Sequence, residues 1–89
     1  MELDWDETNI EHISKHQIET REAEEALVDH KRIKLKSYNV INEKRQGFIG
    51  KTEDGRILAI ILTQRNNKIR IVTAREASTN EKKLYRRQK

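Results

Sequence analysis

Two histidines and a lysine near the N-terminus are the residues of this sequence best suited to acid–base chemistry. His12 and His16 are four residues apart, and Lys15 directly precedes His16. Histidine can donate or accept a proton because its ordinary pKa lies near neutrality, and lysine can do so where neighbours or burial lower its pKa. The His12-x-x-x-His16 spacing also suits a zinc pair on a helix, but no motif supplies further ligands. We therefore expect no metal site and no cofactor, with one imidazole in a site and the other supporting it.

Arginines in the second half of the chain form a second group of candidates. An arginine stays protonated and can hold a phosphate through two parallel hydrogen bonds. The candidates are Arg45, Arg65, Arg70 and Arg75. Side chains alternate along a regular strand, so Arg75 should share a face with Ile69, Ile71 and Thr73, and Arg70 should lie on the opposite face. Alternatively, Arg45 and Arg75 only form salt bridges with acidic N-terminal helices.

The composition restricts the chain to one small domain, residues 1–89. Of its 89 residues, 34% are hydrophobic and 38% are charged, so the core must be concentrated in few segments. Cysteine is absent, which excludes disulfides and thiolate metal sites. The apolar run 57–62 is too short to cross a bilayer, and the acidic start of the chain does not resemble a secretory signal. We expect a cytoplasmic protein that does not contact membranes.

Charge is distributed unevenly along the chain. Residues 1–30 contain ten acidic and two basic side chains, whereas residues 31–89 contain five acidic and seventeen basic ones. This asymmetry indicates a basic surface that binds a polyanion or an acidic partner. The alternative is that the lysines and arginines only solvate the exposed sides of strands and a helix.

Local patterns predict an α+β fold. Leu3 and Trp5 alternate with acidic residues, as in a short edge strand, and Trp5 should be part of the core. Asp6 is the expected N-cap of a helix over residues 7–16. Thr20 is the expected cap of a second helix that extends to Asp29.

The rest of the chain predicts an antiparallel sheet of three to four strands and a C-terminal helix. Strands are expected over 33–38, 44–52, 56–64 and 68–75. Strand 56–64 is apolar on both faces, so it should be central and covered on both sides. Asp54-Gly55 and Asn66-Asn67 are the expected tight turns. Ser78-x-x-Glu81 is a capping box that opens the basic last helix.

Taken in order, several blocks resemble the BrnT family of toxins. The opening carries Trp5-Asp6, Lys15-His16 and Ile18. The middle carries Glu43-Lys44-Arg45, Phe48-Ile49-Gly50-Lys51-Thr52, Asp54-Gly55-Arg56 and Thr63-Gln64-Arg65. The end carries the run from Ile69 to Arg75 and then Glu81-Lys82-Lys83-Leu84-Tyr85. In the family a glycine usually follows Lys-His, and here that position is Gln17.

This resemblance implies a RelE-like fold, metal-independent ribonuclease activity in a type II toxin–antitoxin system, and a cognate antitoxin of the ribbon-helix-helix type. DNA is then a partner only indirectly, through the antitoxin, because no helix-turn-helix pattern is evident in this chain. Cleaving RNA without a metal needs a base, an acid and cations that stabilise the phosphorane. We expect Lys15 and His16, facing Arg45 and Arg75 from the sheet, to supply these functions, with His12 in support.

The remaining candidates are expected to hold RNA. Arg65 and Arg70 would bind backbone phosphate or partner carboxylates, and Tyr85 would stack on a base or pack in the core instead. The substitution of the usual glycine by Gln17 keeps a second hypothesis open. In it the chain retains the fold but acts as a non-enzymatic module that binds RNA or the antitoxin.

Overall fold

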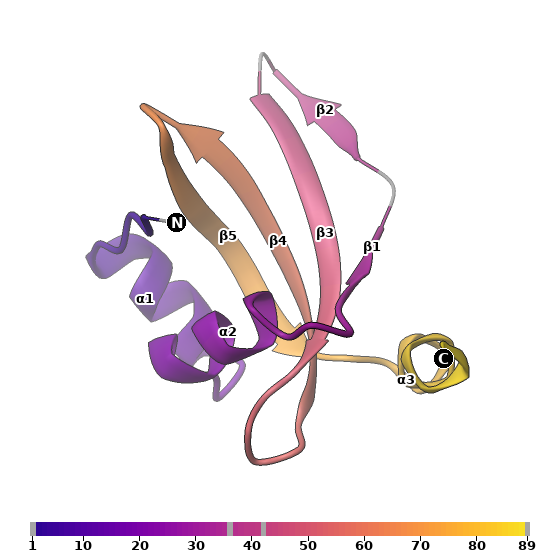
Figure 1. Cartoon of the computed structure of the whole chain (residues 1–89). Helices are drawn as coiled ribbons and strands as arrows, with labels where there is room; N and C mark the ends of the chain where they lie inside the picture. The colour runs from indigo at the N-terminus through magenta and orange to yellow at the C-terminus, as the bar shows by residue number, and fades with distance from the viewer. Residues whose placement is uncertain (1, 36, 42, 89) are drawn as a thin grey trace.

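The computed structural model of the chain describes residues 2–35, 37–41 and 43–88. Within these residues two helices are followed by five strands and a third helix (Figure 1). The helices are α1 (Glu7–Ser14), α2 (Thr20–Leu27) and α3 (Thr79–Arg87). The strands are β1 (Ile33–Lys34), β2 (Tyr38–Val40), β3 (Glu43–Lys51), β4 (Ile57–Arg65) and β5 (Lys68–Glu76). This order confirms the predicted α+β class. No helix in the described part of the chain is both long enough and apolar enough to cross a membrane.

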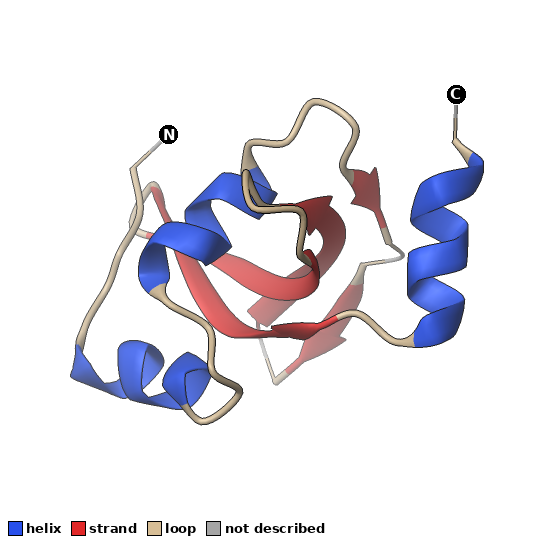
Figure 2. Cartoon of the chain, turned by 90° about the horizontal axis from the view of Figure 1, so that it is seen from below, coloured by secondary structure: helices blue, strands red, loops and turns tan. Residues whose placement is uncertain are grey.

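The strands form one antiparallel sheet in the order β1-β3-β4-β5, and β2 pairs with the same edge of β3 as β1. As predicted, β4 is central and covered on both faces. Leu58 and Ile60 belong to a core under α1 and α2, whereas Ile57 belongs to a second core with Tyr85 of α3. Seen from below, the curved sheet lies between the N-terminal helices and α3 (Figure 2).

A β-bulge in β5 determines which side chains share a face. Thr73 lies opposite Ile61, but the next pair along the ladder is Ile71 with Leu62, so β5 has one extra residue at this point. Alternation is therefore broken, and Arg70 lies opposite Thr63 on the face that also carries Arg75. The prediction that Arg70 and Arg75 lie on opposite faces is wrong, because it assumed a regular strand.

Gln17 stands in the bend after α1, at the position where the family usually has a glycine. Helix α1 ends at Ser14, two residues before the predicted end. The Gln17 N–H donates to the Ser14 carbonyl at 2.9 Å, and the Ile18 N–H donates to the Ile13 carbonyl at 3.2 Å. These are the two bonds of a Schellman motif, and they require a left-handed residue at Gln17, whose φ is 61°. The chain therefore makes the turn that glycine favours, with a side chain that disfavours it.

The second helix also begins and ends earlier than predicted. Its N-cap is Glu19 rather than Thr20, and the Glu19 N–H donates to the Glu22 carboxylate at 3.0 Å. The helix stops at Leu27, before Asp29, because the Asp29 carboxylate accepts backbone N–H groups outside the helix. A side chain that binds the backbone in this way favours a turn over a further helical residue.

The strand predicted over 33–38 consists of two short strands, β1 and β2. Lys34 lies opposite Phe48 and Tyr38 lies opposite Arg45. Tyr38 is four residues after Lys34, whereas their partners Arg45 and Phe48 are three residues apart on β3. This mismatch breaks the ladder into two pieces.

The predicted turns and the last cap are confirmed. Gly55, Asn66 and Asn67 have φ values of 90°, 52° and 63°, as tight turns of glycine and asparagine require. Ser78 and Glu81 form the capping box of α3.

The N-terminal segment is held to the edge of β5. The predicted edge strand is a single parallel bridge between Leu3 and Ile69, in which the Asp4 N–H donates to the Ile69 carbonyl at 2.8 Å. Trp5 is half-buried against the first core, as predicted, and its indole N–H donates to Glu24 at 2.9 Å.

The close approach of α2 to β3 depends on Gly50. A Cβ atom added at Gly50 would lie 2.0 Å from the carbonyl oxygen of Ala26. Because backbone atoms oppose each other here, α2 would have to move. We expect Gly50→Ala to lower the free energy of unfolding by about 3 kcal/mol, measured by urea denaturation. Unchanged stability would show that α2 can shift without cost.

Replacing Gln17 with glycine should stabilise the protein. A residue with a side chain in the left-handed region costs about 1–2 kcal/mol. Glycine avoids this cost, but part of the gain is lost because glycine has more conformational entropy in the unfolded chain. We expect Gln17→Gly to raise the free energy of unfolding by about 1 kcal/mol, and Gln17→Ala to leave it unchanged or lower it. A stabilisation by alanine equal to that by glycine would contradict this explanation.

Candidate active site

Three of the predicted arginines meet in one cleft of about 260 Å³ at the β4–β5 hairpin end of the sheet. Arg45 of β3, Thr63 of β4 and Arg70 of β5 lie opposite one another across the sheet. Arg65 is two residues beyond Thr63 and thus on the same face. This face is opposite the one that packs under α2. The cleft is lined by Thr8, Asn9, His12, Glu43, Arg45, Thr63, Arg65, Arg70, Ile71 and Val72.

Glu43 contacts two of these arginines, although the sequence indicated it only as part of the Glu43-Lys44-Arg45 block and not as a site residue. One carboxylate oxygen accepts from Arg45 Nε at 2.9 Å, and the other pairs with Arg65 Nη2 at 3.2 Å. Arg45, and to a lesser extent Arg65, lower the pKa of Glu43, and Glu43 in turn raises the pKa of Arg45. Glu43 lies two residues before Arg45 on the same strand, so strand alternation was a signal for their common face.

Arg70 connects the cleft to the start of α1. Its guanidinium lies 2.8 Å from Asp6 and 3.6 Å from Asp4, and its side chain is only 16% exposed. Asp6 is also the N-cap of α1, where it accepts the Asn9 N–H. The Arg70 hydrogen bond lowers the pKa of Asp6. Arg70 is therefore built into the junction between β5 and α1.

Of the residues predicted for acid–base chemistry, His12 lies at this cleft. His12 is among the lining residues of the cleft, whereas Lys15 and His16 are not. Lys15 caps the end of α1, and both Lys15 and His16 are exposed. The ring centroids of His12 and His16 are 6.1 Å apart. His16 thus adjoins the residue that reaches the cleft, one helical turn away.

Arg75 lies on the same face but is engaged elsewhere. It is opposite Ala59, further along the sheet towards α3. Two of its nitrogens donate to the two carboxylate oxygens of Glu81 at 2.7 and 3.0 Å. Glu81 also accepts the Ser78 N–H in the capping box, and the Arg75 bond contributes most to lowering the pKa of Glu81 to about 2. Arg75 therefore fastens α3 to β5.

Tyr85 lies in the interior. It is 7% exposed within the second core, as the packing alternative predicted. Its hydroxyl donates to Asp29, and burial followed by this bond raises the pKa of Tyr85 to about 12. In this position the ring packs against core residues. Stacking of Tyr85 on an RNA base stays a prediction.

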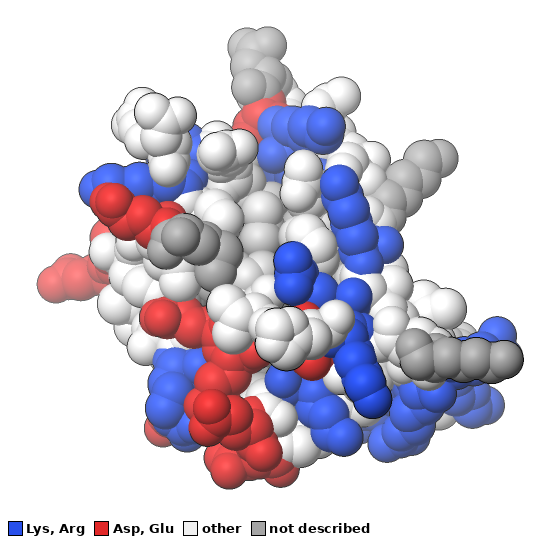
Figure 3. Space-filling model, viewed as in Figure 1, with Lys and Arg blue, Asp and Glu red and all other residues white. Residues whose placement is uncertain are grey.

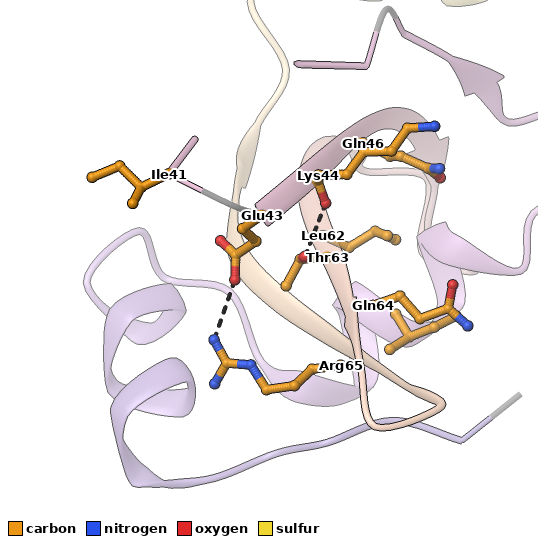
Figure 4. Close-up of a pocket in the computed structure, with 9 residues that line it drawn as sticks. Ile41, Glu43, Lys44, Gln46, Leu62, Thr63, Gln64 and Arg65 are labelled. Atoms are coloured by element: carbon orange, nitrogen blue, oxygen red, sulfur yellow. Dashed lines mark hydrogen bonds and ion pairs between the residues drawn. The ribbon is translucent and has the colours of Figure 1, made fainter. Parts of the chain in front are cut away.

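A second cavity, of about 530 Å³, adjoins the cleft and shares Glu43, Thr63 and Arg65 with it (Figure 4). The buried Thr63 hydroxyl donates to the Lys44 carbonyl at 2.9 Å, which joins β3 to β4 between the two hollows. On the face of the molecule that Figure 3 shows, acidic side chains gather around the N-terminal helices and basic ones towards β1 and α3. Among residues 2–35, 37–41 and 43–88, no group of three or more metal-ligating side chains is present.

The cleft can hold an anion. Arg45 and Arg65 share one carboxylate, so this pair of cations is only half neutralised. His12 adds an imidazole, a group that can accept or donate a proton in catalysis. A phosphate diester would therefore meet both cations and a proton carrier in the same hollow.

The Arg75–Glu81 pair generates a stability prediction. The folded-state pKa of Glu81, about 2, is below the ordinary 4.5, so its stabilisation is present above about pH 4.5 and is lost as the pH falls through about 2. We expect Glu81→Gln to cost about 1 kcal/mol of unfolding free energy at neutral pH. This modest figure allows for solvent screening, because the Arg75 side chain is 46% exposed. Urea unfolding should show the difference vanish near pH 2.

The matched control is Glu53→Gln, which removes one charge from an exposed turn residue. It should leave stability unchanged at either pH. A cost of Glu81→Gln that persists at low pH would assign the effect to shape rather than charge.

Comparison with known proteins identifies the family of the chain. A search of curated proteins finds no match. The sequence model of a family described as the ribonuclease toxin BrnT of type II toxin–antitoxin systems matches residues 5–81. The matched span contains every strand, both N-terminal helices and all residues that line the cleft. The chain therefore belongs to the BrnT family of ribonuclease toxins.

Proposed function

We propose that the chain is the toxin of a type II toxin–antitoxin pair and cleaves RNA without a metal at the cleft between α1 and the sheet. The observation that carries this proposal is the meeting of Arg45, Arg65 and His12, which come from three different elements, in one hollow. Family membership supports the reaction class, and the position of these side chains in the cleft supports the roles proposed for them.

In this mechanism the arginines bind the phosphate. Arg45 and Arg65 reach the cleft from adjacent strands and keep their positive charge throughout. The negative charge on the phosphate grows as the 2′-hydroxyl attacks and the phosphorane forms. Fixed cations at this position stabilise that charge without reorganising, which favours the transition state over the bound substrate.

His12 is the group proposed to move a proton at the cleft. It would take the proton of the 2′-hydroxyl or give one to the departing 5′-oxygen. His16, with its ring 6.1 Å from that of His12, and the neighbouring Lys15 would serve the second transfer at the rim. The roles expected for His16 and Lys15 are thus retained as proposals, and His12, expected only to support the site, is proposed to act within the cleft.

The proposed partners are RNA and an antitoxin. A type II system supplies a protein antitoxin. We propose that it is of the ribbon-helix-helix type, that it connects the complex to DNA, and that the pair acts in the cytoplasm.

The test is incubation of the purified chain with single-stranded RNA in excess EDTA. Wild type should cleave the RNA, and a 2′-deoxy substitution at the cut site should block cleavage. We expect His12→Ala and Arg65→Ala to lower the single-turnover rate by about 100-fold. His16→Ala and Lys15→Ala, assayed in parallel, assign the second proton transfer.

The control is Arg87→Ala, which removes an exposed arginine of α3 outside the cleft and should preserve the rate. Cleavage that depends on added metal, or that survives both cleft substitutions, would contradict the assignment.

A second candidate function is RNA or antitoxin binding without cleavage. The observation that favours it is the position of Lys15 and His16 outside the cleft lining. Phosphate contacts release counterions, so binding of this kind weakens steeply with salt. Salt-dependent RNA binding by wild type with no product formed would support this function over catalysis.

A further inference from the structure

We propose that Glu43 is a positioning residue, which sets the geometry of Arg45 and Arg65 for the transferring phosphate. The proposal rests on the ribonuclease function proposed above. Each carboxylate oxygen of Glu43 holds a different guanidinium, at 2.9 Å for Arg45 and 3.2 Å for Arg65. Both arginines therefore converge on one point, although they come from different strands.

The sheet places Glu43 for this purpose. Arg45 lies opposite Thr63, and continuing that register by two residues brings Glu43 opposite Arg65. Among the described residues, the backbone ladder between β3 and β4 ends at Arg45 and Thr63, and the Thr63 hydroxyl joins the two strands there by donating to the Lys44 carbonyl. Thr63 is 1% exposed, so this link is shielded from water. The carboxylate thus bridges the strands just where their backbone pairing stops (Figure 4).

The contacts leave part of each guanidinium available. Arg45 uses Nε towards Glu43, and Arg65 uses Nη2. Within the described residues, no other ion pair of these two side chains is formed. Their remaining N–H groups can donate to phosphate oxygens while Glu43 still holds both arginines. Such preorganisation raises the rate because the donors need not reorient during the reaction.

Glu43 is poorly suited to be the general base itself. A base works best when its pKa lies near the working pH. Arg45 and Arg65 lower the pKa of Glu43 instead, and both of its oxygens are already bonded to cations. The carboxylate therefore acts through the arginines rather than on the substrate.

Charge gives this role a kinetic signature. Glu43 and the two arginines together carry a net charge of +1. Without the carboxylate, the two arginines carry +2 and repel each other. A glutamine at this position replaces one of the two oxygens with an NH2 group that cannot accept, so one of the two guanidiniums loses the oxygen that it contacts. The added positive charge should strengthen binding of ground-state RNA, whereas the lost geometry should weaken stabilisation of the phosphorane. A fall in kcat without a rise in KM is then expected.

The experiment compares wild type, Glu43→Gln and the control Glu53→Gln, which removes one charge from the exposed turn before Gly55. For Glu43→Gln we expect kcat to fall by about 10-fold or more, with KM unchanged or lower and the acid limb of the pH–rate profile retained. Binding of a 2′-O-methyl RNA, which cannot be cut, should be unchanged or tighter. Glu53→Gln should match wild type throughout.

A structural readout separates this proposal from the ribonuclease proposal. In ¹⁵N spectra of the arginine side chains, Glu43→Gln should shift the Nε–Hε signal of Arg45 or of Arg65, and Glu53→Gln should shift neither. If wild type fails to cut RNA, the ribonuclease proposal fails, and these spectra still decide whether Glu43 sets the arginines.

Three outcomes would overturn the positioning role. The first is that neither arginine signal moves in Glu43→Gln. The second is an unchanged kcat in a variant whose signals do move. The third is loss of the acid limb of the pH–rate profile, which would make Glu43 the base.

Discussion

The cleft exists because β5 contains one extra residue. Without the bulge, Arg70 would lie on the face that packs under the N-terminal helices. With it, Ile71 and Ala74 both join the first core, while Arg70 and Arg75 both lie on the opposite face. A bulge costs one unpaired residue in the ladder and turns the strand. As a consequence, β5 supplies apolar side chains to the first core and two arginines to the opposite face.

The arginines of that face are held by carboxylates from different parts of the chain. Arg70 is held by Asp4 and Asp6 before α1, Arg75 by Glu81 of α3, and Arg45 with Arg65 by Glu43. Two of these sets join a terminal element to the sheet. The third joins two neighbouring strands and leaves an excess of positive charge in the hollow. The same residue type therefore joins terminal elements to the sheet at two places and lines the proposed phosphate site at the third.

The sequence was informative where a signal depends on neighbouring residues. The Ser78-x-x-Glu81 cap, the Asn66-Asn67 turn and the apolar strand β4 are local patterns, and the structure has all of them. It was uninformative where the outcome depends on registration between strands. The bulge allows Ile71 and Ala74 both to pack in the first core, and no pattern within β5 predicts it. Residue type predicted a histidine near the arginines. Which of His12 and His16 reaches the cleft depends on how α1 packs against β5, and this packing could not be predicted from the sequence.

The residues of the cleft come from segments that are far apart in the sequence. Its arginines belong to two successive hairpins, β3–β4 and β4–β5, whose strands are close in sequence, whereas His12 arrives on a helix that precedes them all. The attachments of that helix segment to β5 include the Leu3 bridge and the Arg70 ion pairs. Peripheral segments of this kind open more readily than a central sheet. Detachment of residues 2–14 would then separate His12 from Arg45 and Arg65 while the sheet stays folded, so the proposed active site would come apart before global unfolding begins.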